Sequence, residues 1–254
     1  VWSIHEDRQG MLWIGSFGGG VIRFDPVKKQ FESHNHDPLL PESLSSNLVW
    51  RVFESRDQVI WIGTDGGGLN RIVQRKQQFN HVTTLPDKKN GLAYSGVNAI
   101  VQSRDDTFWI ANDGGGFQHY DPLTDTARLF RHIPGNSNSL SSDLTECILV
   151  DHRNMVWIGT YNGGLNSFNP ETGQFTHYKS ENENANSLSD NRIWTLYEDS
   201  RQRIWAGTRN GLNMISPDRK TIQRYLHDKA NPDSISDNGI WAVLEDSDKD
   251  IWIG

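Results

Sequence analysis

One tryptophan recurs in this chain at an almost constant interval of 48 residues. Each copy stands in a short apolar run such as Leu-Trp-Ile-Gly or Val-Trp-Ile-Gly. The copies are Trp13, Trp61, Trp109, Trp157, Trp205 and Trp252. A period of this length indicates an array of one supersecondary unit, because a single unit cannot bury its apolar face without a neighbouring copy. The sequence is therefore predicted to form a repeat protein.

Each repeat has the pattern of four short strands. An apolar strand such as 49–53 precedes the tryptophan strand, and a glycine cluster such as 66–68 follows it. A third strand ends at a turn such as the Asp-Pro pair 25–26, and a fourth strand leads into a long polar loop. Four strands in a period of about 48, with no apolar helical period, are typical of a β-propeller blade.

The predicted fold class is all-β, a propeller built of four-stranded blades. Five complete repeats and two strands of a sixth make 22 strands, which do not divide into whole blades. Since a closed ring requires whole blades with paired edges, we expect an arc of a larger propeller and one propeller region over 1–254. The predicted repeats are 1–47, 48–95, 96–143, 144–191, 192–238 and the partial repeat 239–254.

Composition narrows the possible functions. The net charge of −7 argues against nucleic-acid binding, which requires a basic face. The single cysteine, Cys147, excludes an intramolecular disulfide, and its apolar surroundings in the sequence favour a buried thiol. His34, His36 and Asp37 share one polar loop without further ligands at metal-binding spacing. We therefore expect no metal site, no cofactor and no catalytic residue.

These repeats resemble those of the two-component regulator propeller family. The family repeat reads roughly L-W-I-G-T-x-x-G-G-L-x-R-F-D-P, and residues 156–175 read VWIGTYNGGLNSFNPETGQF. Residues 186–199, NSLSDNRIWTLYED, match the part that follows. The resemblance implies a seven-bladed propeller in the periplasmic part of an inner-membrane signalling protein, reaching the membrane only through segments outside this sequence. It also implies an oligosaccharide or other small-molecule ligand, a homodimer in the full-length protein, and a histidine kinase or diguanylate cyclase as output.

Positions that vary in chemistry within the constant repeat are the candidates for ligand binding. One such position opens the first strand, and an Asn or Glu there would be costly if fully buried. We expect this position to be partly exposed at the channel mouth, where aromatic rings can stack on a sugar and polar groups can bond its hydroxyls. Alternatively, its tryptophans only pack between blades. The residues are Trp2, Trp50, Asn98, Glu146, Trp194 and Trp241.

A second variable position lies in the glycine loop, two residues after the glycine of the tryptophan strand. Binding residues concentrate on loops held by a rigid scaffold, so these side chains are predicted to face a ligand. They are Phe17, Asp65, Asp113, Tyr161 and Arg209. By contrast, the constant tryptophan is predicted to pack between blades. Acid pairs such as Glu198-Asp199 recur at a turn and are predicted to cap it.

Three functions are compatible with these residues. The favoured one is an extracytoplasmic ligand-sensing propeller that is not itself an enzyme. The second is a protein-interaction propeller that uses the same end of the blades. The third is a propeller lyase or hydrolase, which the candidate residues disfavour because they include no histidine.

Overall fold

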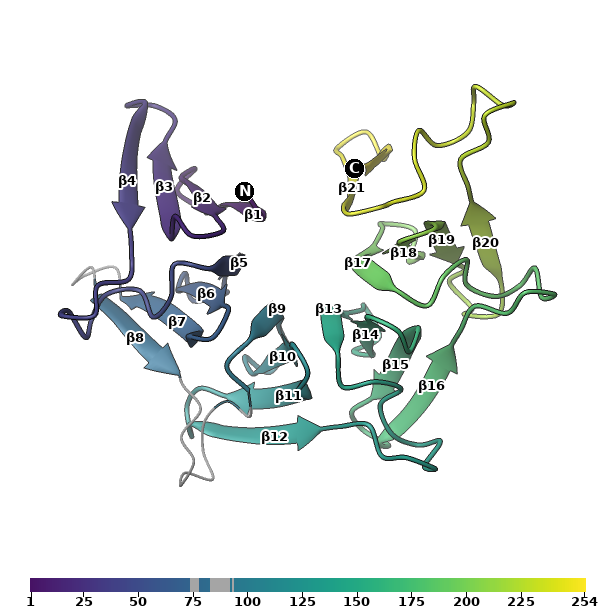
Figure 1. The fold of residues 1–254 in the computed structure, drawn as a ribbon, viewed down its shortest axis with the longest axis horizontal. Helices are drawn as coiled ribbons and strands as arrows, with labels where there is room; N and C mark the ends of the chain where they lie inside the picture. Colours follow the sequence, from purple (N-terminus) through teal and green to yellow (C-terminus); the bar gives the residue numbers. More distant parts are fainter. Residues whose placement is uncertain (74–77, 83–91, 93) are drawn as a thin grey trace. The chain divides into compact units, whose positions relative to one another are not determined.

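The computed structural model describes residues 1–73, 78–82, 92 and 94–254, and its regular elements there are strands (Figure 1). Within these residues no helix is long and apolar enough to cross a membrane. The chain divides into two compact units, Val1–Leu129 and Phe130–Gly254.

The first unit is built from three antiparallel sheets, each a four-stranded meander in which neighbours along the chain are paired. Strand β12 ends one residue beyond the boundary of the unit. The first sheet contains β1 (Ser3–Glu6), β2 (Leu12–Gly15), β3 (Val21–Asp25) and β4 (Gln30–His34). The second contains β5 (Val49–Glu54), β6 (Ile60–Thr64), β7 (Gly68–Val73) and β8 (Gln78–Val82). The third contains β9 (Val97–Gln102), β10 (Phe108–Asn112), β11 (Gly116–Asp121) and β12 (Thr126–Phe130).

The second unit repeats this arrangement in two four-stranded sheets and one two-stranded sheet. The first of them contains β13 (Thr145–Val150), β14 (Val156–Thr160), β15 (Leu165–Asn169) and β16 (Gln174–Tyr178). The second contains β17 (Ile193–Glu198), β18 (Ile204–Thr208), β19 (Gly211–Ile215) and β20 (Ile222–Tyr225). The last contains β21 (Val243–Glu245) and β22 (Ile251–Ile253). The predicted all-β fold of four-stranded blades is confirmed. The exact limits of the repeats stay a prediction.

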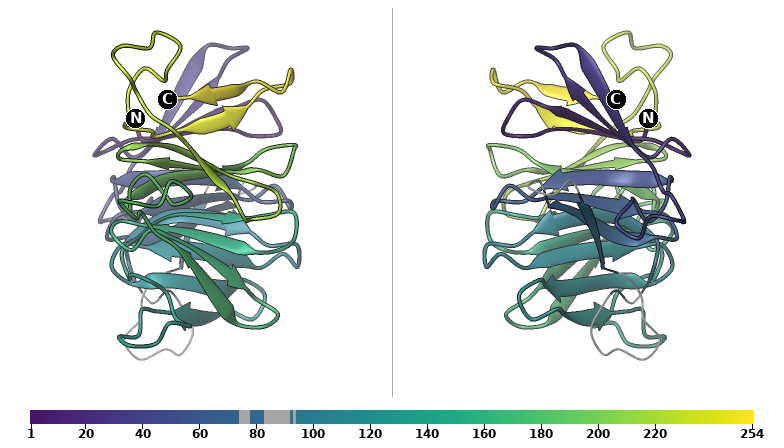
Figure 2. Two further views of the ribbon diagram at one scale, coloured as in Figure 1. Left: turned by 90° about the vertical axis from the view of Figure 1, so that its right-hand side faces the viewer. Right: turned by 90° about the vertical axis from the view of Figure 1, so that its left-hand side faces the viewer.

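The core of each unit lies between successive sheets, which lie face to face in Figure 2. Trp13 of the first sheet packs with Ile60 and Ile62 of the second. In the second unit, Trp157 packs with Ile193 and Ile204 of the sheet that follows. The recurring tryptophans are 1 to 5% exposed as far as Trp205, so the predicted packing between blades is observed. Trp252, in the two-stranded sheet, is 62% exposed.

A hydrogen bond from the indole N–H fixes most of these tryptophans. Trp205 donates through Nε1 to Oδ2 of Asp199 over 2.7 Å, and Trp157 donates to Asp151 over 2.9 Å. The same bond joins Trp13 to Asp7 and Trp252 to Asp246. In the second repeat the acceptor is a serine hydroxyl, with Trp61 donating to Ser55 over 3.2 Å. The acceptor always lies six residues before the tryptophan.

The same aspartate closes the turn between the first two strands. Oδ1 of Asp199 accepts the backbone N–H groups of Arg201 and Arg203 at 3.0 and 2.9 Å. The glutamate beside it caps a different turn, because Glu198 accepts the backbone N–H of His152 in the preceding sheet over 2.8 Å. Capping of the turn was expected from the acid pairs, whereas the bonds to the indole and to the neighbouring sheet were not.

A buried asparagine ties three of the long loops to the sheet that follows, and the first pair is Asn70 with Ser45. Asn166 of β15 accepts from the backbone N–H of Ser141 at 3.0 Å and donates to the Ser141 hydroxyl at 2.8 Å. The pair formed by Asn213 and Ser189 repeats this geometry. Because buried polar groups are costly when unpaired, these reciprocal bonds fix the position of each loop on the next blade.

Asp199→Ala should lower the free energy of unfolding by about 2–4 kcal/mol, because it leaves buried N–H groups without an acceptor. Urea denaturation followed by tryptophan fluorescence measures this loss. Asp248→Ala is the matched control, since Asp248 is an exposed acid in the corresponding turn of the last repeat, and it should change stability by less than about 0.5 kcal/mol. Equal effects of the two changes would contradict a special role for Asp199.

The stability that the Asp199 contacts contribute should also depend on pH. Burial favours a raised pKa for this carboxyl, but hydrogen bonds from Trp205 and Arg203 and the Arg203 charge outweigh it, so the pKa lies below its ordinary value. A lowered folded-state pKa gives stability that is present above the unfolded value of about 3.9 and is lost as pH falls through the folded pKa. The stability difference between wild type and Asp199→Asn should therefore be constant at neutral pH and shrink below about pH 4. A difference that grows in acid would contradict this assignment.

Candidate functional site

The first variable position coincides with a β-bulge in four sheets. In the first strand of each of these sheets, the register of the ladder shifts by one residue. The four bulge residues are Trp50, Asn98, Glu146 and Trp194. A bulge bends the strand and re-aims the side chain of the extra residue, which is why bulges are enriched beside binding sites.

Trp2 and Trp241 occupy the same place at the start of the remaining sheets. Trp2 donates its backbone N–H to Gly15, and the N–H groups of Trp241 and Ala242 both donate to the Gly254 carbonyl, at 2.7 and 3.0 Å. Two successive N–H groups on one carbonyl are the pattern of a bulge. Trp2 is 49% and Trp241 59% exposed, and the other four residues of this position are half-buried.

In the first unit, three predicted residues form an exposed aromatic group. The Trp2 and Trp50 rings lie 4.7 Å apart, close to edge-on. Phe17 lies 6.3 Å from each of them and is 64% exposed. The structure thus brings a glycine-loop residue together with two bulge-position residues of successive repeats.

The other three candidate residues of the first unit are polar. Asp65 lies in the second repeat, and Asn98 and Asp113 lie in the third. Asp65 and Asp113 each donate a backbone N–H to the residue two before the bulge of their own sheet, Leu48 and Gly96, at 2.9 and 3.0 Å. A methyl group built on Gly96 would lie 3.2 Å from Cβ of Asp113 and 3.9 Å from Oδ1 of Asp65. Both side chains therefore border the same glycine, two residues from the bulge at Asn98.

In the second unit, two predicted tryptophans stack face to face. The Trp194 and Trp241 rings are 3.9 Å apart with an interplanar angle of 14°. A methyl group on Gly239 would meet the Trp194 ring at 3.4 Å, so the absence of a side chain there leaves room for the stack. Stacked aromatic rings contribute about 0.5–1.5 kcal/mol beyond the area they bury.

Beside this stack, the glycine-loop residues contact an arginine that the sequence did not single out. The guanidinium carbon of Arg192 lies 3.5 Å from the Tyr161 ring centre, and its Nε donates to the Tyr161 carbonyl over 3.4 Å. Arg209 is exposed and donates its backbone N–H to the Arg192 carbonyl over 3.2 Å. The structure therefore joins Tyr161 and Arg209 through Arg192. Glu146 lies at its own bulge in the preceding sheet.

One set of side chains among the described residues has the spacing of a metal site: Asp151, His152 and Glu198. Its charges are already engaged by protein groups. Arg219 lies 3.0 Å from Oδ2 of Asp151 and 3.6 Å from Oε1 of Glu198, while Nδ1 of His152 contacts Glu198 at 2.5 Å. A metal ion would have to displace the guanidinium, so this set has the character of an ion-pair network.

The loop histidines are also engaged in structural contacts. Nδ1 of His36 contacts the Leu44 carbonyl at 2.8 Å, and the same contact recurs between His132 and Leu140. The His34 ring stacks on Trp13, and burial lowers its pKa. These histidines hold the long loops and leave the candidate site to aromatic, amide, carboxylate and guanidinium groups.

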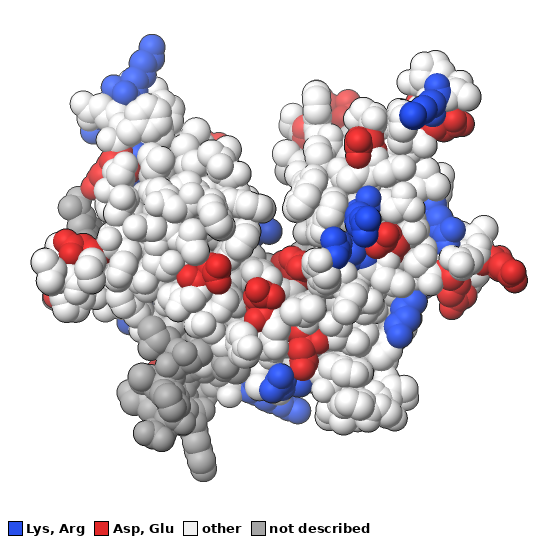
Figure 3. All heavy atoms as spheres, viewed as in Figure 1, with Lys and Arg blue, Asp and Glu red and all other residues white. Residues whose placement is uncertain are grey.

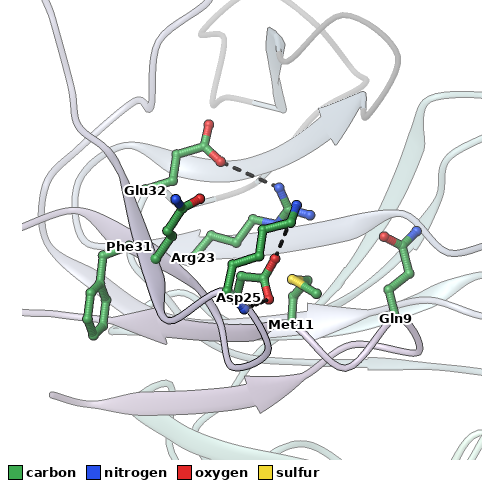
Figure 4. A pocket seen from close by; sticks show the side chains of 8 residues that line it. Gln9, Met11, Arg23, Asp25, Phe31 and Glu32 are labelled. Carbon is green, nitrogen blue, oxygen red and sulfur yellow. Dashed lines mark hydrogen bonds and ion pairs between the residues drawn. The ribbon is translucent and has the colours of Figure 1, made fainter.

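A cavity of about 550 Å³ lies at the other end of the first sheet, beside the turns that follow β1 and β3 (Figure 4). Its charged groups pair with one another: Arg23 with Glu32 at 3.4 Å and Lys28 with Asp25 at 3.5 Å. Phe31 points away from these pairs. The charged side chains of the cavity are therefore paired with one another, while the buried Nε of Arg23 has no hydrogen-bond partner.

The sheets and their register define a β-propeller whose variable residues gather at the bulge end of the blades. Four segments match the family model for the two component regulator propeller, residues 1–18, 43–66, 187–210 and 234–254. These four segments, about a third of the chain, carry the repeat pattern of that model.

Solved structures have the same fold. The extracellular domain of the hybrid two component system BT3049 from B. thetaiotaomicron is 21% identical with a TM-score of 0.77, over 100% of this chain and 38% of that one. The extracellular domain of BT4673 from the same organism is 23% identical with a TM-score of 0.77, over 99% and 33%. Virginiamycin B lyase from Staphylococcus aureus is 14% identical with a TM-score of 0.70, over 99% and 76%. No curated protein matches in sequence.

The stacked indoles have a spectroscopic consequence. Two coupled indoles give an exciton signal in circular dichroism, so Trp194→Ala and Trp241→Ala should each remove the same band. Trp252→Ala is the matched control, because Trp252 is exposed to a similar degree but lies outside the stack. The Trp2–Trp50 pair, with rings 4.7 Å apart, contributes its own signal in every variant. A signal that either of the first two changes leaves at its wild-type strength would contradict the stacked geometry.

Proposed function

We propose that this chain is the extracytoplasmic ligand-sensing propeller of a bacterial membrane-anchored signalling protein, and that it binds an oligosaccharide. The observation that carries the proposal is the exposed aromatic groups at the bulge positions, one in each unit. The matches to the repeat model and the likeness to the extracellular domains of the systems BT3049 and BT4673 support a sensory role. The chain spans 38% and 33% of the length of those two domains.

An oligosaccharide suits these groups for a physical reason. A pyranose ring has an apolar C–H face and a rim of hydroxyls, so it needs flat aromatic surfaces flanked by hydrogen-bonding groups. The Trp2, Phe17 and Trp50 group supplies such a surface in the first unit, with the carboxylates of Asp65 and Asp113 in the same unit. In the second unit the Trp194–Trp241 stack is accompanied by Glu146, Tyr161 and Arg209.

Signal transfer requires two states of the protein that bind the ligand with different affinity. In this proposal, the ligand changes the association of two protomers near the membrane. The output module is a histidine kinase or a diguanylate cyclase. These parts of the proposal rest on the family of the repeats.

Two alternatives make different predictions. A protein-interaction propeller would use the same exposed rings against a protein partner and would bind no sugar. An enzyme would turn over its substrate. The fold of virginiamycin B lyase is similar, so this alternative is tested as well. The absence of histidine from the eleven candidate residues disfavours acid–base chemistry of that kind.

Removing the aromatic surfaces should weaken sugar binding. The double variants Trp2→Ala/Trp50→Ala and Trp194→Ala/Trp241→Ala should each lower affinity about tenfold or more, since each deletes a stacking surface worth at least about 1.4 kcal/mol. Isothermal titration with a panel of neutral and acidic oligosaccharides measures this. Phe31→Ala is the control, because Phe31 is 69% exposed but lies at the other end of the first sheet.

The same titrations separate the alternatives. Unchanged affinity in both double variants would remove the proposed aromatic site. Chromatography of the titration mixtures tests for cleavage, and catalytic turnover of any oligosaccharide would favour the enzyme. A protein partner captured by the wild type but not by either double variant, with no sugar bound, would favour the interaction propeller.

A further inference from the structure

Two arginines stand side by side at the bulge end of the β17–β18 blade. Arg192 immediately precedes β17 and Arg209 immediately follows β18, and their backbones are joined by the 3.2 Å hydrogen bond between them. Figure 3 shows basic side chains on this face in the region of β17 and β18. Among the described residues, the arginines in ion pairs are others: Arg23, Arg56, Arg131, Arg203 and Arg219.

A shortage of acidic residues does not explain why Arg192 and Arg209 form no ion pair within the part of the chain that the structure describes. The chain has 32 acidic and 25 basic Lys and Arg residues, so carboxylates are in excess. Two like charges carried by residues whose backbones are bonded to each other repel, and an anion within reach of both side chains would be stabilised by both. The pair is therefore a place where this acidic protein would favour a negatively charged ligand.

Arg192 is held in place by contacts that leave its outer nitrogens available. Its guanidinium lies over the Tyr161 ring at 3.5 Å, and its Nε donates to the Tyr161 carbonyl. The guanidinium is planar, so the Nη atoms remain as a fork of donors suited to a carboxylate or a sulfate. A side chain ordered before binding loses less entropy when the ligand arrives.

The two arginines occur together in one repeat only, which argues against a structural requirement of the fold. The positions equivalent to Arg192 carry Leu48, Gly96, Leu144 and Gly239. Those equivalent to Arg209 carry Phe17, Asp65, Asp113 and Tyr161. The second, third and fourth blades have the same backbone bond at this place without either guanidinium.

The arginine pair lies next to the indole stack. Arg192 is two residues before Trp194, a distance of about 7 Å along an extended strand. One sugar unit spans a comparable length. An anionic substituent on the arginines and a sugar ring on the exposed face of Trp241 therefore fit one ligand.

We propose that the bulge end of the β17–β18 blade binds the anionic group of an acidic saccharide, with Arg192 and Arg209 as the donors and the Trp194–Trp241 stack as the platform. This inference rests on the proposed saccharide binding and adds its charge specificity. The shared chemistry is a carboxylate or a sulfate on a sugar ring.

The test uses the full chain and three tetrasaccharide probes in calorimetric titrations at low salt. The first probe is tetragalacturonate, the second is its methyl ester, which has the same rings without the charge, and the third is a sulfated galactan tetrasaccharide. The variants are Arg192→Gln/Arg209→Gln and Trp194→Ala/Trp241→Ala. Arg201→Gln is the matched control, because Arg201 is exposed in the turn at the opposite end of the same sheet.

We expect at least one acidic probe to bind about tenfold or more tightly than the methyl ester, and the double arginine variant to lose that preference. Arg201→Gln should behave as wild type, and added salt should weaken the acidic probe selectively. A preference for tetragalacturonate identifies a carboxylate ligand, and a preference for the galactan identifies a sulfate ligand.

The outcomes that overturn this inference are distinct from those that overturn the function. If acid and ester bind equally and only the tryptophan variant weakens them, the arginine assignment is wrong and the saccharide site stands. If the arginine variant abolishes binding and the tryptophan variant does not, the ligand is an anion without a stacked sugar. Saccharide binding by the Trp194–Trp241 stack is then overturned. If no probe binds, both proposals are overturned for this blade.

Discussion

The bond between a recurring indole and the acceptor six residues before it, found for five of the six tryptophans, is the constraint on which the blades depend. One aspartate, such as Asp151 or Asp199, accepts backbone N–H groups that close a turn and an indole N–H that fills the space against the next sheet. Turn geometry and sheet packing are thereby determined by a single side chain. Ser55 keeps the bond to the indole in the second repeat with a neutral acceptor, and its hydroxyl donates to the Val59 carbonyl in the turn.

The two ends of a blade differ in their side-chain contacts. At the turn end the contacts repeat and satisfy one another, as the Asp151, Glu198 and Arg219 network illustrates. At the bulge end the backbone bonds repeat but the side chains differ, from the aromatic group around Trp50 to the arginine pair at Arg192. A shared frame with variable side chains is how binding surfaces are built on repeat proteins.

The periodic part of this structure was predictable from sequence, because burial between blades selects the same residue in each copy. The strands, the packing of the tryptophans and the capped turns follow from that repetition. The bulge at Trp50 was not predicted, since one extra residue leaves the apolar pattern of a strand unchanged. Arg192 was missed because its contact with Tyr161 joins residues 31 apart and crosses from one repeat to the next. The aspartates six residues before Trp157 and Trp205 recur in the sequence, but the acid pairs predicted only a capped turn and not the bonds to the indoles.

The bulges have a consequence for how such a chain can diversify. A residue without a partner across the ladder contributes little to strand pairing, so exchanging it leaves the register of its sheet intact. Trp, Asn and Glu already occupy this position within one backbone frame. Each duplicated repeat thus inherits one side chain that selection can change at small cost to folding. The ligand preference of one blade can therefore change while the residues that determine the fold stay the same in all blades.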